Sequence, residues 1–135
     1  MIRASAAVAH PWLCDVMGHL NTRHYVGMFD DANMILIARL GYSFRDAQTS
    51  PVGWADIRNE VDYLAEVPAG LVVEIYSAVV KLGSKSITLL SEMRCAESGK
   101  THARMTAVMV YFDRREKKSL PLTDEIRAAA TALMT

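Results

Sequence analysis

The sequence predicts an α+β fold in which one antiparallel sheet wraps around one long central helix. Three observations support this prediction. A single long segment with helical spacing, Asn21 to Gly41, follows one short strand-like segment. Four strand-like segments come after it, and the last three follow one another across tight turns, as in an antiparallel meander. The second half of the helix, Met34 to Ala38, is apolar all round, which is typical of a helix enclosed by other elements.

Size and composition favour a single soluble domain, residues 1–135. The chain is long enough to bury a core without disulfides or metals. Basic and acidic residues number 15 each, which gives no sign of a nucleic-acid partner. The only cysteines, Cys14 and Cys95, give no disulfide framework and fit a reducing compartment. No window approaches the roughly 18 apolar residues of a membrane span, and no signal peptide is recognisable. We therefore expect a cytoplasmic protein that does not insert into membranes.

The elements are expected in the order strand, helix, four strands and short helix. Ile2 to His10 is small and partly β-branched, and Pro11 ends it. The central helix begins at Asn21, a plausible N-cap, and Gly41 ends it. Its apolar positions recur with helical spacing at Tyr25, Met28, Phe29, Ala32, Ile35, Leu36 and Leu40.

The remaining strands are separated by turn residues. Trp54 to Glu66 alternates with period two, placing Ile57 and Tyr63 on one face. The three strands of the meander are expected at Leu71 to Leu82, Ser86 to Cys95 and Thr101 to Phe112. A charged run then leads to Thr123, the expected N-cap of an alanine-rich final helix.

The candidate chemistry lies where the polar loop from Asp15 to Asn21 meets the helix N-terminus. The first helical turn leaves backbone N–H groups unpaired, and such an end can hold an oxyanion. A carboxylate one loop away can act as base or nucleophile on a carbonyl that those groups polarise. The alternative is that Asp15 only caps the turn before the helix. His19 similarly has either a substrate role or a local one, and Asn21 is more simply a cap.

A thiol nucleophile or a metal site is not favoured in this loop. Cys14 is next to Asp15, but neighbouring side chains on an extended loop point apart. His10, His19 and His24 lack a recognisable ligand spacing, so no metal is expected.

The pattern Asp15-x-x-Gly18-His19-x-Asn21-x-x-x-Tyr25, followed by a helix ending in Leu40-Gly41, resembles hotdog-fold acyl-CoA thioesterases of the 4-hydroxybenzoyl-CoA thioesterase type. The turns at 81–86 and 98–100 and the ending at 118–122 are also similar to that family. The resemblance spans nearly the whole chain. It implies a curved sheet around the helix, dimers joined sheet edge to sheet edge, active sites at the dimer interface, and tetramers as a common outcome.

The resemblance also assigns roles. Asp15 matches the acidic residue of the family, as nucleophile or general base, and the backbone N–H of Thr22 would polarise the thioester carbonyl. Coenzyme A is part of the substrate, so no separate cofactor is implied. The turn at Ser84, Lys85 and Ser86 would lie near the coenzyme phosphates, and a lysine suits a phosphate. Gly18 would supply a special backbone conformation. Other substrate contacts are expected from Tyr25 and Trp54, although packing is an open alternative for both.

For the substrate, the stretch from His10 to Ala32 looks like thioesterases of carnitine breakdown, which act on betainyl-CoA, a short acyl ester with a quaternary ammonium. Trp12, Trp54 or Tyr25, together with Asp30 or Asp31, would then hold the cation. The alternative function is a non-hydrolytic acyl-CoA-binding protein of the same fold. A dehydratase of this fold is disfavoured, because no convincing histidine arrangement stands at the helix start.

Overall fold

The structure, a computed structural model, describes all residues from 1 to 135. Six strands, two α-helices and two short 3-10 turns make up the chain. In chain order they are β1 (Ile2–Val8), η1 (Pro11–Leu13), η2 (Thr22–His24), α1 (Tyr25–Arg39), β2 (Val52–Tyr63), β3 (Val72–Leu82), β4 (Ser86–Cys95), β5 (Thr101–Asp113), β6 (Lys118–Ser119) and α2 (Asp124–Ala132). Neither helix is long and apolar enough to cross a membrane.

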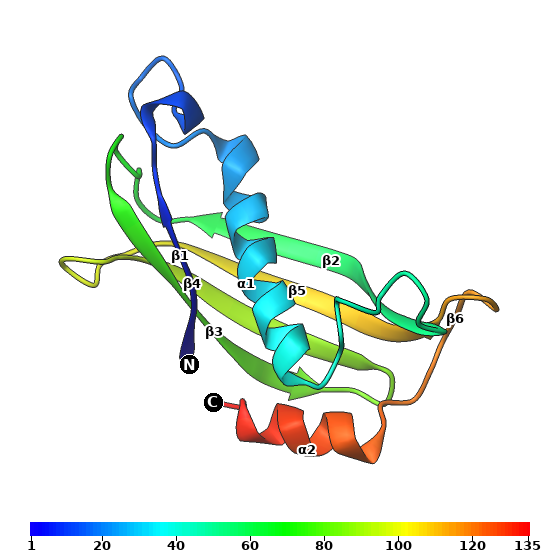
Figure 1. Cartoon of the computed structure of the whole chain (residues 1–135). Helices are drawn as coiled ribbons and strands as arrows, with labels where there is room; N and C mark the ends of the chain where they lie inside the picture. The colour runs from blue at the N-terminus through cyan, green and yellow to red at the C-terminus, as the bar shows by residue number, and fades with distance from the viewer.

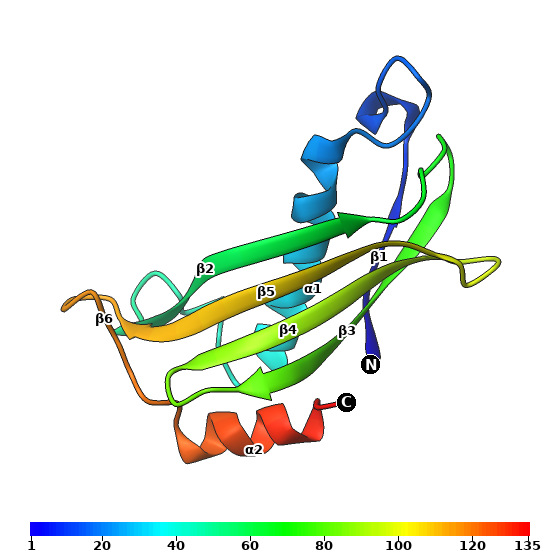
Figure 2. The ribbon, with the colours of Figure 1, turned by 180° about the vertical axis from the view of Figure 1, so that it is seen from behind.

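One antiparallel sheet of six strands curves around α1 (Figure 1). Its main path has the order β1-β3-β4-β5-β2, and β6 pairs with β5. The view from behind shows that α1 covers only the concave side of the sheet (Figure 2). This is the hotdog arrangement that the resemblance implies, and the predicted meander of β3, β4 and β5 is confirmed. The order leaves β1 and β2 as the two edge strands.

The core lies between the concave face of the sheet and one side of α1. Phe29, Ala32, Leu36 and Ile37 of this helix are 0 or 1% exposed. The expected enclosure of Met34 to Ala38 on all sides is wrong, because Met34 and Ile35 are 42% and 38% exposed. The sheet covers one side of the helix only, so the opposite apolar stripe faces outward in the single chain.

The strand positions agree with expectation except in β2 and in the short strand β6, which is not predicted. Tyr63 pairs with Ala103 and Val52 with Asp113, so β2 runs antiparallel along the whole of β5. A β-bulge between Asp56 and Arg58 interrupts this pairing. The predicted alternation of two faces in Trp54 to Glu66 is therefore not kept, because a bulge shifts the phase of the side chains.

The C-terminal segment closes one end of the molecule. Thr123 caps α2 by accepting a hydrogen bond from Ile126 N at 3.2 Å, as predicted. After α2, Met134 forms a parallel bridge with Val79, on the strand that also pairs with β1. Both chain ends therefore lie close together, as Figures 1 and 2 agree.

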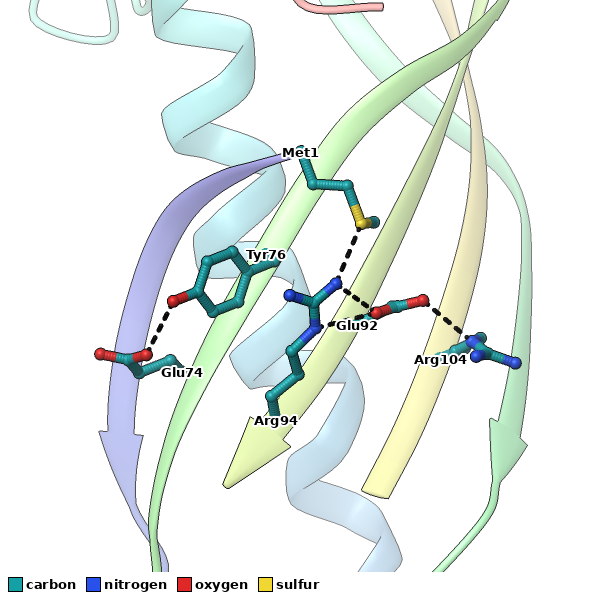
Figure 3. Close-up of polar contacts among 6 residues, drawn as sticks. All are labelled: Met1, Glu74, Tyr76, Glu92, Arg94 and Arg104. Carbon is teal, nitrogen blue, oxygen red and sulfur yellow. Dashed lines mark hydrogen bonds and ion pairs between the residues drawn. The ribbon is translucent and has the colours of Figure 1, made fainter. Parts of the chain in front are cut away.

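The convex face of the sheet carries a polar network instead of a second layer (Figure 3). The Arg94 guanidinium lies over the Tyr76 ring, 4.5 Å from its centroid, and forms an ion pair of 2.6 Å with Glu92. Glu92 also contacts Arg104 at 3.1 Å. Tyr76 donates a hydrogen bond of 2.9 Å to Glu74. This face is therefore tied together across three strands by charged side chains.

Candidate active site

The loop before α1 folds around the carboxylate of Asp15. Its Oδ1 accepts hydrogen bonds from Met17 N at 2.9 Å and His19 N at 3.5 Å. Gly18, at φ +79°, lets the loop turn back, and Asp15 N donates to His19 O at 2.9 Å. Oδ2 makes no hydrogen bond with the chain. Asp15 thus caps its own loop with one oxygen and keeps the other available.

This loop is fixed to the connection between β2 and β3. Leu20 N donates to Val67 O at 2.8 Å, and Ala69 N donates to Gly18 O at 2.9 Å. His19 Nε2 lies 3.2 Å from Glu66 Oε2, while His19 Nδ1 is buried without a partner. Backbone bonds on both sides of His19 therefore hold the loop in place against a second loop.

The start of the helical region offers an unpaired backbone donor next to this loop. Asn21 is the N-cap of η2, and its Oδ1 accepts a hydrogen bond from Arg23 N at 3.1 Å. Thr22 N makes no hydrogen bond with the chain, and Thr22 is exposed. An N–H group at this position carries the partial positive charge of a helix start. It can receive a developing negative charge on a carbonyl oxygen.

Tyr25 connects the loop with the core. It is 4% exposed, and its ring meets Tyr63 edge-on with centroids 5.0 Å apart. Burial, and next the neighbouring Tyr63, raise the pKa of Tyr25, and the charges of Glu66 and Asp15 add to this. Its hydroxyl therefore stays protonated near the Asp15 loop, but most of the side chain serves packing.

The site residues expected from the sequence fall into two groups at opposite ends of β2. Asp15, Gly18, His19, Asn21, Thr22 and Tyr25 gather around the N-terminus of α1, near the Tyr63 end. Trp54 lies at the Val52 end, opposite Tyr111, and the turn from Ser84 to Ser86 is at the same end because Ser86 pairs with Val110. A 12-residue strand spans roughly 40 Å. One chain does not bring the two groups together.

A cavity of about 380 Å³ opens between α1 and the first half of β2. Its walls are largely apolar and aromatic, and it also contains two facing carboxyl groups. Among the lining residues are Asp30, Met34, Phe44, Trp54, Asp56 and Met109. Burial raises the pKa of both Asp30 and Asp56, and the charges of Asp56 and Asp31 raise the pKa of Asp30 further. Neither carboxylate forms an ion pair or hydrogen bond. The one cation that lines the same cavity is Arg114, whose guanidinium is bonded to Ala47 O and Ser50 O.

Several residues expected near the substrate lie elsewhere. Trp12 is 75% exposed and stacks on His10, with centroids 4.3 Å apart. Asp31 is exposed, and Tyr25 belongs to the Asp15 group. None of the three lines the cavity. Of the residues expected to hold a cation, only Trp54 and Asp30 line the cavity.

The turn from Ser84 to Ser86 is tied to α2. Gly83 O accepts a hydrogen bond from Arg127 at 2.7 Å, and Leu122 N donates to Ser84 O at 2.9 Å. Lys85 is exposed and makes no ion pair. The turn presents one free cation to solvent.

The thiol of Cys14 is turned away from Asp15. Its Sγ lies 3.4 Å from His10 O and 3.8 Å from Ala9 O, within hydrogen-bonding range of both carbonyls. No three histidine, cysteine or carboxylate side chains of the chain converge on a metal-binding position. The geometry therefore favours Asp15 over Cys14 as the reactive group of the loop.

Sequence reasoning missed Asp56, Glu66 and Asn33. Asp56 belongs to the polar half of an alternating strand, and nothing local in the sequence shows that a bulge places it opposite Asp30. Glu66 contacts His19 only through tertiary packing. Asn33 did carry a signal, since it stands at helical spacing from Phe29 and Ile37. It is 1% exposed with neither amide atom paired, on the side of α1 from which Ile37 lines the cavity.

Comparisons with known proteins identify the family and the fold of the chain. A model of the thioesterase-like superfamily matches residues 9–130. Among solved structures, the PA5185 protein of Pseudomonas aeruginosa is 26% identical, with a TM-score of 0.84, and the match covers 96% of this chain and 90% of that one. No curated protein matches the sequence.

Two more distant structures share the fold. A 1,4-dihydroxy-2-naphthoyl-CoA thioesterase from Synechocystis is 16% identical with a TM-score of 0.83, covering 96% of this chain and 95% of that one. The SAV2348 protein of Staphylococcus aureus, solved in complex with CoA, is 15% identical with a TM-score of 0.86, covering 98% and 85%.

Proposed function

The chain belongs to the thioesterase-like superfamily of thioester hydrolases, and from this premise we propose that it hydrolyses acyl-CoA esters to a free acid and CoA. The observation that carries the proposal is that two groups occur together before α1. These are Asp15, with one carboxylate oxygen free, and the backbone N–H of Thr22, which has no partner in the chain. The CoA bound to the Staphylococcus aureus protein of the same fold supports coenzyme A as the leaving group.

In the proposed reaction, the Thr22 N–H donates a hydrogen bond to the thioester oxygen, which gains negative charge as a tetrahedral intermediate forms. Asp15 either takes a proton from the attacking water or attacks the carbonyl itself, giving a mixed anhydride that water then opens. In both routes the C–S bond breaks and the thiolate of CoA leaves. The acid formed at Asp15 protonates the thiolate in the general-base route, and solvent protonates it in the nucleophilic route. His19, Gly18 and Asn21 position the loop and the helix start.

We propose that a second copy of the chain completes the site. The outer edge of β2 pairs with no strand of its own chain, and Ile57 on it is 61% exposed. A two-fold axis joining two β2 edges makes the strands antiparallel. The Tyr63 end of one subunit, next to Asp15, then lies beside the Val52 end of the other, next to the cavity. The two groups of site residues meet in the dimer; a tetramer of two such dimers is the further expectation.

For the acyl group, we propose a short chain that bears a cation, with betainyl-CoA as the candidate. Trp54 and Asp30 line one cavity, and Asp56 adds a second carboxylate. A quaternary ammonium is attracted both by an aromatic face and by carboxylates that have no other partner. The cytoplasmic location expected from the sequence stays a prediction.

The test is a thiol-release assay with purified protein and a panel of acyl-CoA esters. We expect hydrolysis of short esters, with betainyl-CoA preferred over butyryl-CoA, which has a neutral chain. Preference for long neutral chains would contradict the substrate proposal. Binding of acyl-CoA without any thiol release would contradict hydrolysis and favour the non-hydrolytic alternative.

A further inference from the structure

A second hollow, of about 320 Å³, lies at the end of β5 where the hairpin to β6 meets the loop after α1. It differs from the cavity in chemistry, because no lining residue is hydrophobic and none is acidic. The lining residues are Gln48, Thr49, Ser50, Pro51, Arg114, Arg115 and Lys117. Three side-chain cations therefore border one polar depression.

One of these cations is fixed in place by the loop. The Arg114 guanidinium donates hydrogen bonds to Ala47 O and, at 3.0 Å, to Ser50 O. These carbonyls hold the guanidinium without neutralising its charge. Arg115 and Lys117 are exposed and make no ion pair. The positive charge of the hollow is therefore free to meet an anion.

The carboxylate of Asp113, next to Arg114 in the sequence, is turned into the hairpin. Asp113 Oδ1 accepts hydrogen bonds from Glu116 N at 2.9 Å and Arg115 N at 2.8 Å, and these bonds lower the pKa of Asp113. Lys117, at φ 56°, takes the left-handed conformation that completes the turn. Asp113 therefore organises the turn and does not line the hollow.

We propose that this hollow binds phosphate groups of the coenzyme A portion of the substrate, an inference that rests on the proposed function. Arginine and lysine together are the side chains that suit phosphate oxygens. The hollow shares Gln48 and Arg114 with the cavity, so both lie at the Val52 end of β2. The turn at Ser84 to Ser86 has Lys85 and, bonded to Gly83 O and Ser84 O, the guanidinium of Arg127. With three cations against two, the hollow is a better phosphate site than the turn that the resemblance pointed to.

The test compares the double variant Arg115→Ala/Lys117→Ala with Lys118→Ala, which removes a neighbouring lysine outside the hollow. With acyl-CoA we expect the double variant to raise KM at least about tenfold at fixed ionic strength, with kcat unchanged. With the matching acyl-pantetheine, which has no phosphate at its end, KM should be the same in both variants and in the unaltered protein. Lys118→Ala should leave all values unchanged.

Three kinetic results would overturn the assignment. One is an unchanged KM for acyl-CoA in the double variant. Another is an effect of the same size on acyl-pantetheine. The third is a tenfold rise in KM for acyl-CoA in Lys85→Ala and not in the double variant. CoA binding, measured by calorimetry on the same variants, tests the phosphate site independently of hydrolysis. If the hollow binds CoA but the protein does not hydrolyse acyl-CoA, only the proposed thioesterase function is contradicted. Saturation of the hollow by inorganic phosphate without any change in CoA affinity would identify a free anion as its occupant and overturn the assignment.

Discussion

Three aspartates show how local surroundings separate roles that the sequence alone cannot distinguish. Asp15 has one oxygen held by backbone N–H groups and a second oxygen free. Asp30 and Asp56 face a partly closed cavity without any hydrogen bond, and burial raises the pKa of each. Backbone donors stabilise a carboxylate, whereas an unpaired carboxylate in a cavity is costly unless a cation arrives. These surroundings support the proposed roles, a reactive one for Asp15 and recognition of a cation for Asp30 and Asp56.

At this scale we predict that Asp30→Asn stabilises the free protein at pH 7 and weakens selection of a cationic substrate. The pKa of Asp30 is raised above 3.8 in the folded protein. The stability gained from protonation is therefore complete below that value and is lost as pH rises through the raised pKa. The variant should melt at higher temperature near neutrality, with a difference that shrinks as pH falls toward 4. Preference for betainyl-CoA over butyryl-CoA should drop roughly tenfold, about 1.4 kcal/mol.

Asp31→Asn is the matched control, because Asp31 is the exposed neighbour outside the cavity. Because the charge of Asp31 acts on Asp30, this variant should raise the melting temperature less than Asp30→Asn does, and it should leave the substrate preference unchanged. Equal behaviour of the two variants would mean that the cavity carboxylate has no special surroundings.

Among the elements, the start of the helical region decides whether the site exists. Asn21 ends the loop and caps η2, which continues directly into α1. Asn21 Oδ1 accepts a hydrogen bond from Arg23 N, and Thr22 N is left without a partner in the chain. The cap thus links helix stability to the geometry of the proposed oxyanion contact.

We predict that Asn21→Ala lowers both stability and turnover, whereas Thr123→Ala lowers stability alone. Each variant removes an N-cap hydrogen bond, at 3.1 Å in the first case and 3.2 Å in the second. Loss of such a cap costs about 1 kcal/mol of unfolding free energy, measurable in urea. Only the first cap borders the site, so only Asn21→Ala should lower kcat. A similar loss of kcat in both variants would assign the effect to general destabilisation.

Most elements could be predicted from the sequence, because each is set by local periodicity and turn residues. β4 begins and ends where its alternation does, and Gly41 ends the helical segment with φ +95°. Two features of β2 could not be predicted from the sequence, its pairing with β5 and the bulge at Asp56, because both depend on residues distant along the chain. For the same reason Asp15 was identified from its own loop, while Asp56, Glu66 and the basic hollow appeared only in the folded structure.

For the whole molecule, the central fact is that one chain places the reactive loop and the acyl cavity at opposite ends of β2. On the convex face of the sheet, charged side chains link neighbouring strands (Figure 3). On the concave face, α1 packs against the sheet with one of its sides only (Figure 1). In the proposed dimer, a second copy would supply the missing half of each site through the free β2 edge.

We predict that Ile57→Lys gives a monomer that retains its fold but loses thioesterase activity. A charge on an edge strand opposes strand pairing between chains, and Ile57 lies at the exposed bulge of β2. Light scattering with size exclusion measures the mass, and circular dichroism checks the fold. Ala6→Lys, on the other edge strand β1, should keep both oligomer and activity. An active Ile57→Lys monomer would show that one chain holds a complete site.

The most direct test of the account is turnover by Asp15→Asn, measured by thiol release with the preferred ester. The change keeps the size and the loop hydrogen bonds of the side chain but removes its base and nucleophile. We predict a fall in kcat of about 10² to 10⁴-fold, the usual contribution of such a group, with CoA affinity unchanged. Asp31→Asn, made alongside, should have the kcat of the unaltered protein. An Asp15→Asn variant that turns over at the same rate as Asp31→Asn would contradict the assignment of the reaction to this loop.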